Sequence, residues 1–203
     1  MMKRFYFTVS FLGEDINESF LVGRCLKILH GFYHRQDIHD IGISFPDWSN
    51  ISIGKRLVFV STNESSLKFL QTQKYFVEMA EMNYFLISKV GECILDSKNS
   101  AVFSRNQKVA DLTITAKKRK LNRLIKRAEQ RGEVYKPKGN EASESIIPFC
   151  HEIPMSSHEN KNDFALIIEK KVYGEANTNI FNSYGLSTNQ KSINPVPIIF
   201  DDL

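Results

Sequence analysis

The sequence lacks long apolar runs and has few cysteines, and both absences exclude classes of protein. No segment of the 203 residues approaches the roughly 20 apolar residues that a membrane-spanning helix requires. The three cysteines, Cys25, Cys93 and Cys150, lie far apart and form no C-x-x-C pair. This spacing favours reduced thiols over a disulfide framework or a zinc site. We therefore expect a soluble, cytoplasmic protein that has no membrane partner.

The signatures of metal-dependent and nucleotide-dependent catalysis are also missing. The sequence contains no H-E-x-x-H motif, no glycine-rich phosphate loop and no cluster of carboxylates. A two-metal nuclease needs several Asp or Glu ligands that converge on one site. We therefore expect neither a metal ion nor another cofactor. The chain does have five histidines, whose titration near neutral pH suits metal-free acid–base catalysis.

The N-terminal half alternates patterns typical of strands and of helices. Asn17 and Asn63 are each suited to cap a helix whose apolar residues recur at helical spacing. Four segments around these helices have strand character: residues 4–12, 41–45, 57–61 and 84–90. The order β-α-β-β-α-β predicts an α+β protein whose first domain, residues 1–97, is ferredoxin-like. This fold serves many functions and therefore names none of them.

The second half of the sequence predicts a smaller α+β domain over residues 98–203. Short apolar runs at 146–149 and 164–168 have strand character. Polar residues fill the segments 132–145 and 150–163, and we expect both segments to be loops.

Positive charge is concentrated at the start of this second half. Residues 1–100 hold 11 Lys and Arg against 11 Asp and Glu, so they are neutral. Residues 101–138 hold 12 against 3, and residues 139–203 hold 4 against 9. A basic block between two non-basic ones indicates a localised site for a polyanion.

A helix at about residues 116–131 would organise this charge. Residues 117–131 contain eight Lys and Arg but one acid, whereas an ordinary surface helix interleaves acids to form i,i+4 pairs. This ratio favours nucleic-acid binding over a merely solvated helix face. An acidic membrane surface is the weaker alternative, because the apolar stripe lacks Trp and Phe. The cations expected to face the polyanion are Arg119, Lys120, Arg123, Lys126, Arg127 and Arg131.

The residues alone do not identify a catalytic group. A single histidine is usually a surface or packed residue, and His30 has only a slight advantage from its position beside Gly31 at the end of the first helix. Ser156 and Ser157 lie in a polar segment and are by default loop residues. Reasoning from the residues therefore stops at an α+β protein that binds RNA or DNA.

Six parts of the sequence match a known family in the order of that family: residues 25–32 (CLKILHGF), 41–46 (IGISFP), 105–107 (RNQ), the basic helix, 183–187 (SYGLS) and 195–197 (PVP). Through these segments the sequence resembles the type I-F CRISPR pre-crRNA endoribonucleases. The segment 150–163 lacks the Ser-Thr-Gly-Gln run of that family, and the stretch after Ser187 lacks its usual glycine. In both places the chain looks more like the version encoded with CRISPR-associated transposons.

The resemblance implies a catalytic role for four residues. His30 matches the catalytic histidine, and Tyr184 matches a tyrosine that packs near it. The catalytic serine would be Ser157, with Ser156 as the alternative. The implied reaction is metal-independent cleavage of CRISPR repeat RNA by attack of its 2′-hydroxyl, which leaves a 2′,3′-cyclic phosphate and a 5′-hydroxyl. A subunit that binds the crRNA hairpin without any chemistry is the alternative.

The resemblance also implies partners and the residues that meet them. Arg105 and Gln107 match a pair that reads base edges at the foot of the stem, and Arg123, Lys126 and Arg127 match the main groove and phosphate contacts. The implied partners are CRISPR repeat RNA, the crRNA 3′ stem-loop and the backbone subunits of a type I-F crRNA-guided complex. Through that complex a transposition adaptor and target DNA would follow. Binding of duplex DNA is a further alternative.

Overall fold

A computed structural model describes residues 2–112, 114–136, 148–156, 163–172, 180–188 and 193–200. The chain is an α+β protein with antiparallel sheets. Its contacts divide it into two compact units: unit 1 is Met1–Arg105 with Phe149–Leu203, and unit 2 is Asn106–Pro148. The division into domains at residues 97 and 98 stays a prediction.

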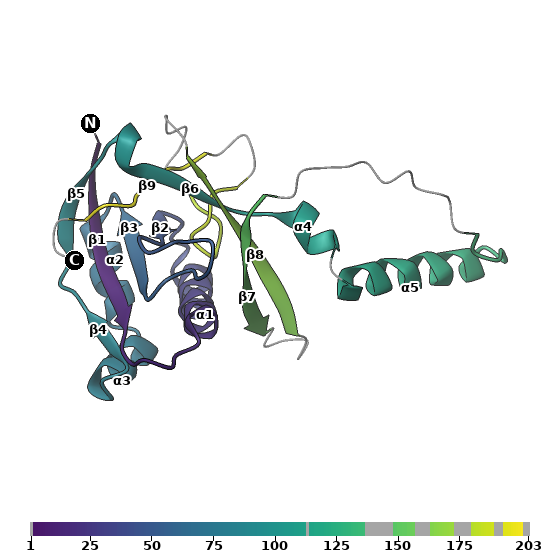
Figure 1. Cartoon of the computed structure of the whole chain (residues 1–203), viewed down its shortest axis with the longest axis horizontal. Helices are drawn as coiled ribbons and strands as arrows, with labels where there is room; N and C mark the ends of the chain where they lie inside the picture. Colours follow the sequence, from purple (N-terminus) through teal and green to yellow (C-terminus); the bar gives the residue numbers. More distant parts are fainter. Residues whose placement is uncertain are drawn as a thin grey trace. The chain divides into compact units, whose positions relative to one another are not determined.

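The first sheet of unit 1 has the strand order β2-β3-β1-β4, and β5 also pairs with β1 (Figure 1). Every pairing is antiparallel, with Phe7 opposite Phe59 and Val9 opposite Leu57. Its strands are β1 (Met2–Phe11), β2 (Ile41–Ser44), β3 (Arg56–Ser61), β4 (Phe85–Ile87) and β5 (Gly91–Leu95). Its helices are α1 (Glu18–Gln36), α2 (Glu64–Gln71) and α3 (Lys74–Glu81).

The element order follows the predicted β-α-β-β-α-β pattern, but the second helix and the last strand each divide in two. Gln73 has an extended backbone (φ −62°, ψ 132°) and begins α3, so one expected helix becomes α2 and α3. Ser88 divides the strand expected over 84–90, because its hydroxyl oxygen accepts the Thr8 N–H at 2.9 Å. A side chain thereby takes a position that a main-chain carbonyl holds in a regular ladder.

Helix α1 begins and packs as its sequence pattern predicts. The Asn17 side chain accepts the Phe20 N–H at 2.9 Å, which satisfies one of the free amides of the first turn. Asn63 caps α2 in the same manner through Ser65. Both predicted N-caps are therefore confirmed. The apolar face of α1 is fully buried in the core and consists of Val22, Cys25, Leu26, Leu29, Phe32 and Tyr33.

The second sheet of unit 1 has the order β7-β8-β6-β9 and is antiparallel. Its strands are β6 (Ser100–Arg105), β7 (Cys150–Ser156), β8 (Asp163–Val172) and β9 (Val196–Pro197), and a short 3₁₀ helix, η1 (Ser97–Asn99), precedes β6.

The loop expected over 150–163 is wrong for its first seven residues, which form β7. His151, Ile153 and Met155 are buried while Glu152 and Pro154 between them are exposed, so the segment has the period of a half-buried strand despite its polar composition. The strand expected at 146–149 begins later, at Cys150. Residues 146, 147 and 157–162 lie outside the described part of the chain.

Helix α1 lies between the first sheet and β7 (Figure 1). The two elements are tightly packed at Gly23, where an added Cβ would collide with the carbonyl oxygen of Pro154 and would lie 3.3 Å from Ile153. Glycine therefore allows the helix and the strand backbone to touch. This contact fixes the end of β7 against the same helix that carries His30.

Unit 2 contains α4 (Gln107–Leu112) and α5 (Ile114–Gln130). Asn106 caps α4 by accepting the Val109 N–H at 3.0 Å. Helix α5 ends in a Schellman turn: Glu133 N–H donates to Ala128 O and Gly132 N–H donates to Glu129 O, both at 2.9 Å. Gly132 has φ +72°, the left-handed conformation that this turn requires. No helix among the described residues is long and apolar enough to cross a membrane.

Candidate active site

The candidate site of unit 1 is built on one stripe of helix α1. Lys27, His30 and His34 are spaced by three and four residues and therefore share a face of the helix. His30 is half-buried, whereas His34 is exposed. The opposite face of α1 fills the core, so the backbone that carries these three side chains is held rigidly.

The Tyr184 ring stacks on the His30 ring, as the resemblance implied. The ring centroids are 4.7 Å apart and the planes differ by 10°. The turn that presents Tyr184 is ordered by Asn182, whose side-chain oxygen accepts the N–H groups of Tyr184 at 2.9 Å and Leu186 at 3.1 Å. The stack covers one face of the imidazole and so restricts its rotation.

Gly185 allows this turn to dock on the first sheet. It has φ +73°, and its carbonyl accepts the Ile43 N–H at 3.0 Å. A Cβ at this position would lie 2.8 Å from Ile43 and 2.9 Å from Leu29. Both the backbone conformation and the lack of space therefore require glycine directly after Tyr184.

The environment of His30 disfavours its charged form. Partial burial lowers the pKa of His30 below its ordinary value, and the nearby His34 lowers it further. The His30 Nδ1 atom is buried and has no hydrogen-bond partner among the described residues. An imidazolium would therefore bury an unsatisfied N–H, whereas the neutral ring does not need both nitrogens to donate. At neutral pH His30 is thus suited to accept a proton.

Ser156 lies beside this helix face at the last position of β7. The Lys27 ammonium donates to the Ser156 hydroxyl at 3.1 Å, a contact between residues 129 positions apart in the chain. The structure therefore brings Ser156 to Lys27, which lies three residues before His30 on α1. Ser157, the other candidate serine, lies outside the described residues.

Sequence reasoning did not single out Lys27. Its only signal was a position three residues before His30, which places both side chains on one helix face. The contact with Ser156 depends on the approach of Gly23 to Pro154, and helical spacing alone gives no indication of that approach.

Arg105 belongs to the same unit and acts on the site electrostatically. Burial raises the pKa of the Tyr184 phenol, while the positive charge of Arg105 acts in the opposite direction. Tyr184 therefore stays protonated near neutral pH and stacks on His30 as an uncharged ring. Gln107 begins α4 in unit 2, and its side-chain amide donates to Asp111 at 2.9 Å.

The basic residues of α5 form an exposed row in unit 2. Arg131 forms an ion pair with Glu133 at 3.2 Å. Within the described part of the chain the other candidates have no salt bridge, which leaves their charges available to a polyanion. These residues are Arg119, Lys120, Arg123, Lys126 and Arg127, all exposed.

Helix α5 has only a partial apolar stripe. Ala128 is buried at 3% exposure, while Leu124 and Ile125 are half-buried. Leu121, the fourth member of the expected stripe, is 44% exposed. The stripe is therefore narrower than its spacing suggested.

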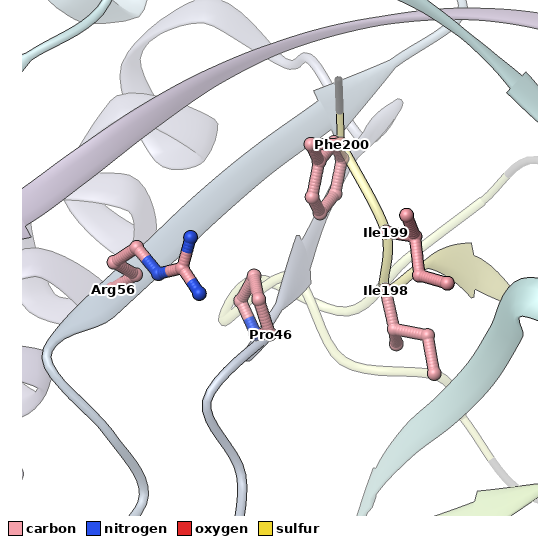
Figure 2. Close-up of a pocket in the computed structure, with 5 residues that line it drawn as sticks. All are labelled: Pro46, Arg56, Ile198, Ile199 and Phe200. Atoms are coloured by element: carbon pink, nitrogen blue, oxygen red, sulfur yellow. The ribbon is translucent and has the colours of Figure 1, made fainter. Parts of the chain in front are cut away.

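Unit 1 also has a cavity of about 230 Å³ whose lining includes none of the candidate site residues (Figure 2). Asp47 accepts hydrogen bonds from Arg56 Nε at 2.9 Å, which raises the pKa of the guanidinium and offsets its charge. We do not assign the chemistry to this cavity, because its described lining offers no group that titrates near neutral pH. The lining residues are Pro46, Arg56, Ile198, Ile199 and Phe200.

The fold and the site together define an α+β protein with a half-buried, stacked histidine on a core helix and an arginine-rich helix in its other unit. The chain belongs to the CRISPR-associated Cas_Csy4 family, whose sequence model matches residues 6–197. No curated protein matches it in sequence.

Two solved structures are similar over most of the chain. One is described as "Crystal structure of Cas6b" (11% identity, TM-score 0.30) and the other as "Crystal structure of CRISPR RNA processing endoribonuclease Cas6b" (13% identity, TM-score 0.32). Each match covers 96% of this chain and 100% of the other. Similarity at this level does not inform the site, so the family assignment depends on the sequence match.

Proposed function

We propose that this protein is a metal-independent endoribonuclease that cleaves CRISPR repeat RNA and remains on the 3′ stem-loop of the product. One observation carries the catalytic part of the proposal: a half-buried imidazole, stacked on Tyr184, with a lowered pKa and with the Lys27 ammonium three residues before it on the same helix. Membership of a CRISPR-associated family supports the choice of substrate.

The neutral His30 ring acts as the general base in this reaction. It takes the proton of the 2′-hydroxyl, the 2′-oxygen bonds to the adjacent phosphorus, and the P–O5′ bond breaks. The leaving O5′ takes up a proton, so the products are a 2′,3′-cyclic phosphate and a 5′-hydroxyl. Lys27 and Ser156 supply hydrogen-bond donors for the charge that develops on the phosphate oxygens, with Ser157 as the alternative serine.

The exposed cations recognise the RNA hairpin. Helix α5 supplies Arg123, Lys126 and Arg127 for phosphates and for the groove, with Arg119 and Lys120 beside them. The major groove of A-form RNA is usually too narrow for side chains, but a short hairpin can open it near its ends.

Arg105 and Gln107 contact bases at the foot of the stem in this proposal. Gln107 must first exchange its hydrogen bond with Asp111 for one to the base. Arg131 is the weakest candidate for an RNA contact because Glu133 already offsets its charge.

After cleavage the protein stays bound to the crRNA, and in this bound form it joins a larger complex. We place it as a cytoplasmic subunit of a type I-F crRNA-guided complex, bound to the backbone subunits and, through the complex, to target DNA. The segment 150–163 and the stretch after Ser187 favour the transposon-encoded subgroup, which has a transposition adaptor as an additional partner. A genome neighbourhood without transposition genes would argue against this subgroup.

The test is a cleavage reaction with labelled repeat RNA from the CRISPR array of the same genome, run in EDTA. We expect one cut, a cyclic phosphate on the 5′ product, and binding without cleavage when the nucleotide at the cut carries a 2′-deoxy substitution. Strict dependence on a divalent cation would overturn the mechanism. Tight hairpin binding with no product from the natural RNA would favour the non-catalytic cap subunit, and equal affinity for DNA of the same sequence would favour a duplex-DNA binder.

A further inference from the structure

The exposed imidazole of His34 lies against His30 and has no role in the reaction as described so far. The two ring centroids are 4.4 Å apart, and the rings meet edge to face at 76°. We infer that His34 is a second catalytic residue, the general acid that protonates the 5′-oxygen as it leaves. This inference rests on the proposed endoribonuclease function.

The spacing of the two histidines fits the two ends of the reaction. In-line attack places the 2′-oxygen and the 5′-oxygen on opposite sides of the phosphorus, so the base and the acid must flank one phosphate. Residues at i and i+4 on a helix have Cβ atoms about 5–6 Å apart, which allows both side chains to reach one phosphate group. Lys27, one turn before His30, extends the same row and places positive charge beside it.

The different environments of the two rings assign their roles. His30 is half-buried, is covered on one face by Tyr184, and has a buried Nδ1 with no partner among the described residues. His34 is exposed, so water can solvate its cation. Two imidazolium ions this close repel each other, and burial already disfavours the charge on His30. The resting pair is then a base at His30 and an acid at His34.

The proton balance of the step is complete. His30 gains the proton of the 2′-hydroxyl, the O2′–P bond forms and the P–O5′ bond breaks. His34 gives its proton to O5′, which leaves as the 5′-hydroxyl. The pair ends with the proton on His30, and exchange with solvent restores the starting state.

The experiment compares two RNAs under single-turnover conditions. One is the natural repeat, and the other carries sulfur in place of O5′ at the cut, because a thiolate leaves without protonation. For His34→Gln we expect a loss of about 100-fold on the natural RNA and a rate within about threefold of the wild type on the sulfur RNA. His30→Ala should lose activity on both RNAs, and His39→Gln, which changes an exposed histidine paired with Asp37, should lose activity on neither.

Three outcomes would overturn the inference. An unchanged rate for His34→Gln on the natural RNA would remove His34 from the chemistry, and an equal loss on both RNAs would make it a positioning residue only. If the wild type cut neither RNA, the proposed function would fail and this inference with it. The first two outcomes leave the proposed function intact.

Discussion

Helices α1 and α5 both carry nitrogen-containing side chains at helical spacing, but these side chains lie in contrasting environments. On α1, His30 is half-buried, stacked on Tyr184 and close to His34. On α5, Arg123 and Arg127 are exposed and form no ion pair with any described residue. Charge density alone can mark where a polyanion binds, because Coulomb attraction acts over a distance. Acid–base chemistry needs altered proton affinity at a fixed position, and that comes only from packing.

We expect the largest effect from His30→Ala, which should abolish the chemistry assigned to α1 but leave the RNA binding assigned to α5. Loss of the general base should lower the single-turnover cleavage rate by about 1,000-fold, within the usual range for acid–base catalysis. Hairpin affinity, measured by filter binding or gel shift, should stay within about twofold, because the charges of α5 are unchanged. A comparable fall in affinity would show that α1 contributes to binding as much as to chemistry.

Two glycines allow a second comparison of the two helices: Gly23 lies at the contact between α1 and β7, and Gly132 lies at the end of α5. Gly23→Ala would force the helix away from Pro154 and should lower the free energy of unfolding by about 2 kcal/mol, as overpacking does. Gly132→Ala at the end of α5 meets no atom within 4 Å and costs only left-handed backbone strain, about 1 kcal/mol.

Urea unfolding of both glycine variants provides the measurement. Gly23→Ala should also slow cleavage, because it displaces Ser156 from Lys27, whereas Gly132→Ala should leave the cleavage rate unchanged. Equal stability of the two variants would mean that the Gly23 contact is not tight in solution.

A smaller effect is expected in the pH dependence of cleavage. His30 must be neutral to act as a base, and burial and His34 lower its pKa, so on the RNA with sulfur at the cut the rate should rise with pH, with a midpoint below the ordinary histidine value of about 6.5. His34→Gln removes one of the two causes, so the midpoint of this rise should move to higher pH. The RNA with sulfur at the cut isolates this step, because its leaving group needs no acid. A midpoint that does not move in His34→Gln would contradict the electrostatic coupling of the pair.

Much of this arrangement could be predicted from the sequence, for reasons that are local. Asn17 caps α1 because a short polar side chain before a helical pattern satisfies its first amides, and the cations of α5 are visible as a simple count. Contacts between distant segments could not be predicted. Lys27 meets Ser156 only because β7 docks on Gly23, and β7 was itself missed because its polar positions are the exposed half of an alternating pattern.

The different environments of His30 and His34 also could not be predicted from the sequence. Their i,i+4 spacing could be read from the sequence, but it did not indicate which ring would be buried. That difference comes from Tyr184, which reaches His30 because Gly185 fits against Ile43 and Leu29. The family resemblance implied the tyrosine, and the segment SYGLS includes the glycine, but only the structure shows that this glycine positions the ring.

The smallest expected effects lie on α5, where single charges are lost from a row. Arg123→Ala or Arg127→Ala should lower hairpin affinity a fewfold at moderate salt and reduce the slope of log affinity against log salt by about one unit, because each phosphate contact releases about one counterion. Arg131→Ala should change the slope less, since Glu133 already offsets that charge. Lys68→Ala, which removes a cation paired with Glu64 on α2, is the matched control and should not change the slope.

Cleavage at saturating protein should be normal in all four variants, because none of these side chains belongs to the His30 site. If Arg123→Ala and Arg127→Ala left both affinity and slope at the wild-type values, α5 would be a solvated helix, and the hairpin would have to be held by unit 1 instead.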